Sequence, residues 1–124
     1  MTTQQRPPLW IGHVTLRTRT LGESEAFMKQ IGMRGVFRGD EVAVLELRGG
    51  THLLLIEDRS AVPGAAEFDL MVEDLDKTYA DFQALGFELS EVREGKIHNS
   101  FTVTEPGGHQ IVVNSTHVPD HAAV

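Results

Sequence analysis

The chain has 124 residues, of which 40% are hydrophobic and 23% are charged, and its formal net charge is −7. This size and composition predict one globular domain, and the acidic balance disfavours nucleic acid as a partner. The sequence lacks both cysteine and an apolar run of about 20 residues, so it predicts no disulfide, no membrane segment and a cytoplasmic location.

The first half of the chain alternates between strand and helix patterns. Residues 1–8 are predicted to be a disordered lead, and residues 9–17 alternate apolar and polar side chains as a strand does. Residues 21–31 follow the helical period, and Gly32 stands where a glycine ends many helices. Further strands are predicted over 34–38, 41–47 and 51–57, with glycine-containing turns between them.

The same order of elements recurs in the second half. A linker over 58–66 leads to a strand over 67–72, a helix over 75–85 and strands near 88–93, 98–104 and 109–114. Leu75 and Gly86 follow Leu21 and Gly32 by the same 54 positions (75 − 21 = 86 − 32). The repeat predicts an α+β fold of two tandem βαβββ modules, residues 9–57 and 67–115, in a single domain with a tail over 116–124.

The strand alternation assigns each side chain to one face of a curved sheet. The apolar set is expected to face the helices on the convex side: Val14, Leu16, Leu53, Leu55, Phe68, Leu70, Val72, Ile111 and Val113. The opposite set then lines a shared cleft: His13, Thr15, Arg17, His52, Leu54, Ile56, Glu67, Asp69, Met71, Gln110, Val112 and Asn114. A row of histidine, hydroxyl and guanidinium in GHVTLRT therefore indicates a pocket wall.

Four segments in this order resemble the vicinal oxygen chelate superfamily of glyoxalases, extradiol dioxygenases and fosfomycin- and bleomycin-resistance proteins. They are GHVTLRT, LGESEAFMKQIGM, its echo LDKTYADFQALGF, and TEPGGHQIVVN. The resemblance covers about residues 9–115 and implies the two-module fold. In the members that use a metal, it implies one divalent ion held by the first and fourth strands of the two modules, where it acts as a Lewis acid.

Carried onto this sequence, the resemblance implies an altered set of metal ligands. His13 and Glu67 occupy the two first-strand positions, whereas the fourth-strand positions hold Leu54 and Val112, which cannot bind metal. His52 lies two residues before Leu54 on the same face and could replace a missing ligand. The expected ligands are therefore His13, His52 and Glu67, a set that suits iron, manganese, zinc or nickel.

Other cleft residues are assigned to the substrate. Arg17 is expected to orient an anionic group, with a salt bridge to Asp69 or another acid as the alternative. Thr15, Asp69 and Gln110 are expected to contact the substrate. His98 is the candidate general base, with a role among the polar residues of a turn as its alternative. His109 is expected to be structural or on the surface.

Two functions follow from these residues. The first is a metal-dependent lyase, isomerase or ring-cleaving dioxygenase that acts on a small substrate with adjacent oxygens. The alternative is a metal-free small-molecule binding protein of the bleomycin-resistance kind, which Leu54 and Val112 favour. A homodimer is expected in either case. Whether His13 and His52 converge on one point would discriminate between the two functions.

Overall fold

A computed structural model describes residues 6–116. The predictions for the start of the lead and for all but the first residue of the tail therefore lie outside the described residues. Neither helix in the described range has the length and apolar content of a membrane span.

The two modules are built from the same succession of elements. The first comprises β1 (His13–Thr18), α1 (Leu21–Gln30), β2 (Arg34–Arg38), β3 (Val42–Glu46), a short 3-10 turn (Arg48–Gly50) and β4 (His52–Glu57). The second comprises β5 (Ala65–Val72), α2 (Leu75–Ala84), β6 (Glu88–Leu89), β7 (Ser100–Thr104) and β8 (Gln110–Ser115). Gly32 and Gly86 follow the helices with φ of 120° and 82°, which explains why glycine stands there.

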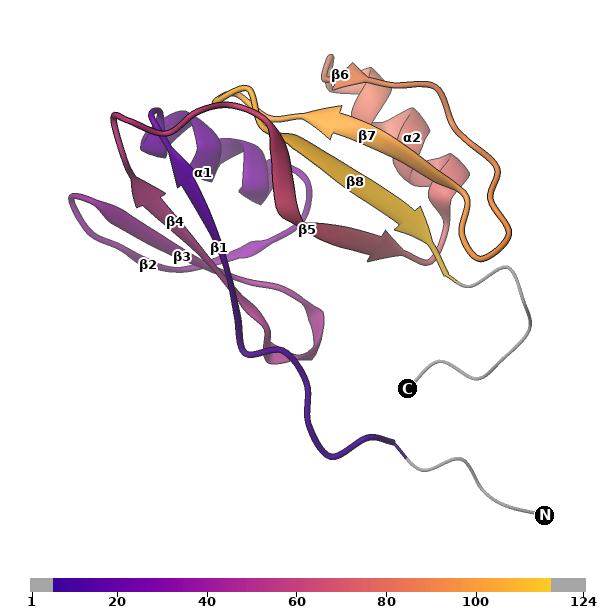
Figure 1. The fold of residues 1–124 in the computed structure, drawn as a ribbon, viewed down its shortest axis with the longest axis horizontal. Coiled ribbons are helices and arrows are strands. Elements are labelled where there is room, and N and C mark those ends of the chain that lie inside the picture. The colour runs from indigo at the N-terminus through magenta and orange to yellow at the C-terminus, as the bar shows by residue number, and fades with distance from the viewer. Residues whose placement is uncertain (1–5, 117–124) are drawn as a thin grey trace.

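Each module forms a four-stranded mixed sheet with the same topology. The strand orders are β1-β4-β3-β2 and β5-β8-β7-β6, and in each sheet the first strand runs parallel to the fourth. The other neighbours pair antiparallel. The two sheets lie side by side with β1 next to β5, and both helices cover the same side (Figure 1). The predicted α+β fold of two βαβββ modules is confirmed.

The largest departure from the predicted elements lies between β6 and β7. A strand was expected near 88–93, but β6 contains only Glu88–Leu89, and Arg93 forms an isolated bridge with Ser100. The seventh strand begins at Ser100 instead of residue 98. The side chain of Asn99 accepts a hydrogen bond from the Gly95 amide at 3.3 Å, a local bond of the kind that competes with strand pairing.

The core lies between the sheets and the helices, as the alternation predicts. Five of the expected convex side chains are at most 5% exposed: Leu16, Leu53, Leu55, Ile111 and Val113. The other four pack against this core while partly exposed: Val14, Phe68, Leu70 and Val72. Full burial of such a side chain is worth about 1.5–3 kcal/mol, so this face stabilises both modules.

Aromatic side chains join the two modules into one core. Phe27 on α1 contacts Phe87 of the second module with ring centroids 4.7 Å apart. Phe82 on α2 lies 5.8 Å from Phe87 and 5.9 Å from Phe101. The first helix therefore packs against both halves of the chain, which fixes how the two sheets are placed.

A buried polar cluster adds a second link between the modules. It consists of Thr18, Ser24, Glu105 and His109, all at most 6% exposed. The Ser24 hydroxyl on α1 donates to Glu105 Oε1 at 2.6 Å, and the His109 amide donates to Glu105 Oε2 at 3.0 Å. Thr18 Oγ1 lies 2.9 Å from the Ser24 hydroxyl. Both carboxylate oxygens of Glu105 are thus hydrogen-bonded, as burial of a carboxylate requires.

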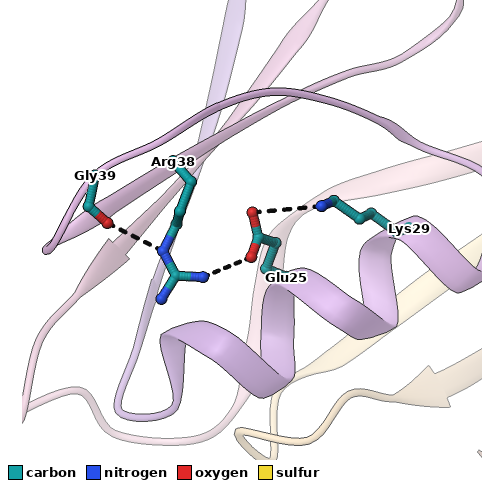
Figure 2. A network of polar contacts seen from close by, with 4 residues as sticks. All are labelled: Glu25, Lys29, Arg38 and Gly39. Atoms are coloured by element: carbon teal, nitrogen blue, oxygen red, sulfur yellow. Dashed lines mark hydrogen bonds and ion pairs between the residues drawn. The ribbon is translucent and has the colours of Figure 1, made fainter.

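The exposed edge strand β2 is held to α1 by charge. Figure 2 shows Glu25 between two cations, with Arg38 Nη1 at 2.5 Å and Lys29 Nζ at 3.8 Å from its carboxylate oxygens. Arg38 also donates to the Gly39 carbonyl oxygen at 3.0 Å. Charged side chains on an edge strand also discourage pairing with another sheet.

Candidate functional site

The polar row of β1 lies on the face turned away from the helices. His13, Thr15 and Arg17 are exposed, whereas the alternating Leu16 is buried. Because β1 pairs in parallel with β4, His13 stands opposite His52 and Thr15 opposite Leu54. This register follows from the apolar alternation, since a slip of one residue would turn the core face to water.

The structure brings two of the predicted metal ligands side by side. The His13 and His52 rings have centroids 5.9 Å apart and cross at 64°. His52 Nε2 lies 3.5 Å from Glu46 Oε2, and Glu46 also pairs with Arg34. Glu46 was missed by sequence reasoning. The feature that could have indicated Glu46 is the β3–β4 hairpin, because Glu46 is the strand partner of His52 in it.

The third predicted ligand does not join this pair. Glu67 lies on β5 in the other module, and no group of three or more histidines, aspartates or glutamates within residues 6–116 is arranged to hold a metal ion. A transition metal requires ligand atoms at about 2.0–2.3 Å, and His52 is instead directed to Glu46. Within residues 6–116, a single chain therefore brings together two of the three expected ligands, a set that does not by itself fit the expected ion.

A large cavity, here called the main cleft, opens between the two modules. Its volume is about 890 Å³. The predicted site residues Glu67 and Asp69 line it together with Val112, one of the two apolar fourth-strand positions. Its other walls are Ile11, Val14, Leu47, Arg48, Thr51, Ala66, Phe68, Leu70, Met71, Val72, Glu73 and Thr116. The cleft is thus mainly apolar with a few acidic groups.

A second cavity, the linker pocket, lies at the other end of β1 and measures about 460 Å³. Thr15, Arg17 and Glu67 line it together with His109 of the buried polar cluster. Its remaining walls are Leu16, Ala61, Val62, Ala65 and Ala66. Two predicted substrate residues and one predicted metal ligand therefore share this pocket.

Arg17 forms an ion pair with Asp58 and not with Asp69. Its Nη1 lies 3.6 Å from Asp58 Oδ2, in the linker, and the Arg17 side chain is 61% exposed. The pKa of Asp58 lies below its ordinary value, chiefly because the Ser60 hydroxyl donates to its carboxylate, with smaller contributions from the Ser60 amide and the Arg17 charge. The exposed Arg17 guanidinium remains accessible from solvent.

The two remaining predicted residues lie outside both cavities. His98 precedes β7, and its Nδ1 is 2.7 Å from the Ser115 carbonyl oxygen. Because a carbonyl can only accept, the proton is on Nδ1. Gln110 is exposed at the start of β8, where its backbone N–H donates to the Gly64 carbonyl oxygen at 2.9 Å. The roles of both residues stay predictions.

Two tandem βαβββ modules with a cleft between them form the fold that the sequence resemblance implies. A model of the Glyoxalase/Bleomycin resistance protein/Dioxygenase superfamily matches residues 10–113, and the chain belongs to this superfamily. No curated protein sequence matches the chain.

Solved structures share the fold at low sequence identity. A lactoylglutathione lyase from Agrobacterium tumefaciens is 20% identical with a TM-score of 0.76, covering 89% of this chain and 96% of that one. A bleomycin resistance determinant encoded on the transposon Tn5 is 18% identical with a TM-score of 0.70, covering 92% and 98%. A fosfomycin resistance protein from Listeria monocytogenes is 17% identical with a TM-score of 0.73, covering 88% and 92%. These similarities establish the fold and leave the activity to the site.

Proposed function

We propose that this chain is a small-molecule binding protein whose ligand occupies the main cleft without the help of a metal ion. The observation that carries the proposal is the apolar side chain at each fourth-strand position. Leu54 and Val112 stand where metal-using members of the superfamily place a ligand, and Val112 lines the cleft. A volume of about 890 Å³ suits a drug-sized molecule.

The walls of the cleft favour a ligand with a flat or bulky apolar body. Val14, Phe68 and Leu70 contribute apolar surface, whereas Arg48 and Glu73 form an exposed ion pair at 3.0 Å. Apolar contact supplies affinity in such a cleft, and a few polar groups fix orientation. A bleomycin resistance determinant shares this fold.

We also propose that the protein works as a homodimer. The concave face carries exposed apolar side chains in the cleft, with Met71 at 55% and Val112 at 39% exposure. A second copy placed over this face would cover them and close the site. Apolar patches rimmed by polar residues are typical of protein interfaces.

The second candidate is a metal-dependent enzyme, which the pairing of His13 with His52 favours. In that case the ion would be held between two copies, with His13 and His52 from one chain and Glu67 from the other. Bound there, the ion would supply a Lewis acid for an oxyanion. His98 and Arg17 would keep their predicted roles as general base and anion clamp.

Ligand binding in the cleft can be tested with an apolar fluorescent probe. The single tryptophan, Trp10, is 69% exposed and precedes Ile11 of the cleft wall, so it offers an intrinsic signal as well. We expect saturable binding of anilinonaphthalene sulfonate. We expect at least about a tenfold loss in Val112→Glu, because the apolar wall gains an unpaired charge.

Ile97→Glu is the matched control, because Ile97 is 56% exposed in the loop before β7 and lines neither cavity. The control is expected to bind the probe like the wild type. Equal probe binding by the wild type and Val112→Glu would contradict the assignment of the cleft.

A further inference from the structure

We infer that the linker pocket receives the acidic group of the ligand and that His109 binds it. This inference rests on the proposed function, because Ala66 and Glu67 line both the linker pocket and the main cleft. A molecule whose apolar body fills the cleft can therefore extend one end into the pocket. The ligand class assigned is an apolar, and preferably aromatic, carboxylic acid.

The imidazole of His109 has hydrogen-bonding capacity that residues 6–116 leave unused. His109 is 6% exposed, and none of the other residues in the described range makes a hydrogen bond with its ring. Among the described side chains, Glu57 Oε2 is the polar atom that is both inaccessible to solvent and without a hydrogen-bond partner. The His109 ring nitrogens also have no partner in the described range, so they are not fully closed off from solvent. The linker pocket, which His109 lines, provides that space.

The backbone holds His109 firmly in this position. Its amide donates to Glu105 Oε2, and its carbonyl oxygen accepts from the Glu105 amide at 2.9 Å. Gly107 packs so closely that a Cβ there would lie 3.3 Å from His109 Cδ2 and 2.7 Å from Glu105 Oε2. A ring held in place before binding loses little entropy when it donates to a ligand.

Of the two charged side chains that line the pocket, Arg17 favours binding of a carboxylate and Glu67 opposes it. Arg17 supplies a cation whose partner Asp58 also accepts hydrogen bonds from Ser60. Glu67 supplies an anion in the same pocket. A ligand carboxylate can accept from both His109 and Arg17, and charge-assisted hydrogen bonds of this kind are stronger than neutral ones. Neutralising Glu67 is therefore expected to raise the affinity for a carboxylate ligand, whereas removing Arg17 or His109 is expected to lower it.

The test compares two ligands of the same shape, 2-naphthoate and 2-naphthalenemethanol, by calorimetry on the untagged full chain. We expect the carboxylate to bind about tenfold more tightly than the alcohol, as one added charge-assisted hydrogen bond allows. Arg17→Gln and His109→Asn should each remove most of this preference, whereas Glu67→Gln should increase it a few-fold. Arg93→Gln removes an exposed cation outside both pockets and should keep the wild-type preference.

Because His109 belongs to the buried polar cluster and its substitution can disturb folding, a measurement on the wild type accompanies the variants. In protein labelled with ¹⁵N-histidine, naphthoate should shift the His109 ring signals, and the alcohol should leave them in place. Equal affinities with unmoved His109 signals would overturn the inference and leave the proposed function standing. Failure of both ligands to bind would overturn both.

Discussion

Glu105 shows how a single side chain supports both modules. It is 2% exposed, and its two carboxylate oxygens accept from the Ser24 hydroxyl and the His109 amide. Loss of one donor leaves a buried charge partly unpaired, which is more destabilising than loss of the same bond in water. The residue that positions His109 in the linker pocket is thus also a link between α1 and the β7–β8 hairpin.

Ser24→Ala is expected to lower the free energy of unfolding by about 1–3 kcal/mol, because Glu105 loses a donor in a buried site. Urea denaturation measures the change. The control is Thr78→Ala, since Thr78 is the repeat counterpart of Ser24 and its hydroxyl donates to the Asp74 carbonyl oxygen at 2.8 Å in an exposed position. We expect the control to change stability by about 0.5 kcal/mol or less. Equal losses would show that the cluster carries no special stability.

The lowered pKa of Asp58 predicts a defined response to acid. Its carboxylate is favoured in the folded chain, so its contribution to stability is present above the unfolded pKa and is lost as pH falls through the folded pKa. Since Ser60 is the main cause, Ser60→Ala should raise the pKa toward the ordinary value of 3.8, and by more than Arg17→Gln does. Carbon-detected NMR titration of Asp58 measures both. A larger effect of Arg17→Gln would contradict the assignment.

At the scale of elements, the two helices begin differently. Asp74 caps α2 by accepting from the Lys77 amide at 3.0 Å, whereas Thr20 at the start of α1 makes no side-chain capping bond. The first helix is stabilised instead by burial of Leu21, Phe27 and Met28 against both modules. Both modules therefore contain the helix, but different interactions stabilise its first turn.

Asp74→Ala is expected to destabilise the protein by about 1 kcal/mol through loss of this cap. Thermal or urea unfolding gives the value. Thr20→Ala is the matched change in α1 and should shift stability by less than Asp74→Ala, because the Thr20 hydroxyl caps no helix amide and makes only long contacts of 3.3 and 3.4 Å to Thr18 and Ser24. A Thr20→Ala effect as large as that of Asp74→Ala would mean that capping does not distinguish the helices.

The sequence predicts these elements well where hydrophobic periodicity and internal repetition agree. It predicts them poorly where side chains form local hydrogen bonds that compete with the backbone hydrogen bonds between strands. The 54-residue offset and the apolar alternation predict both sheets and their core faces. The short length of β6 could not be predicted, because it is accompanied by a local hydrogen bond from the Gly95 amide to the Asn99 side chain. Hydrophobic periodicity does not indicate such a bond. The His13–His52 pairing follows from parallel first and fourth strands, whereas Glu46 depends on the register of β3. The burial of His109 depends on packing between modules, which is set by contacts distant in sequence.

Across the whole molecule, the two sheets lie side by side with β1 next to β5. The helices cover a shared core, whereas the main cleft and the linker pocket are lined from both modules, or from β1 and the linker, by core-facing as well as exposed side chains. The described part of one chain offers a mainly apolar cleft and brings together two of the three expected metal donors. We propose that the main cleft binds an organic ligand without a metal ion, in a homodimer.

The most direct test is elemental mass spectrometry on the untagged dimer peak from size-exclusion chromatography, with His13→Ala alongside. If the ligand binds without a metal ion, both proteins should contain well below one equivalent of iron, manganese, zinc or nickel per chain, including after incubation with each metal and desalting. Near one transition-metal ion per site in the wild type, lost in His13→Ala, would contradict metal-free binding and favour the metal-dependent enzyme.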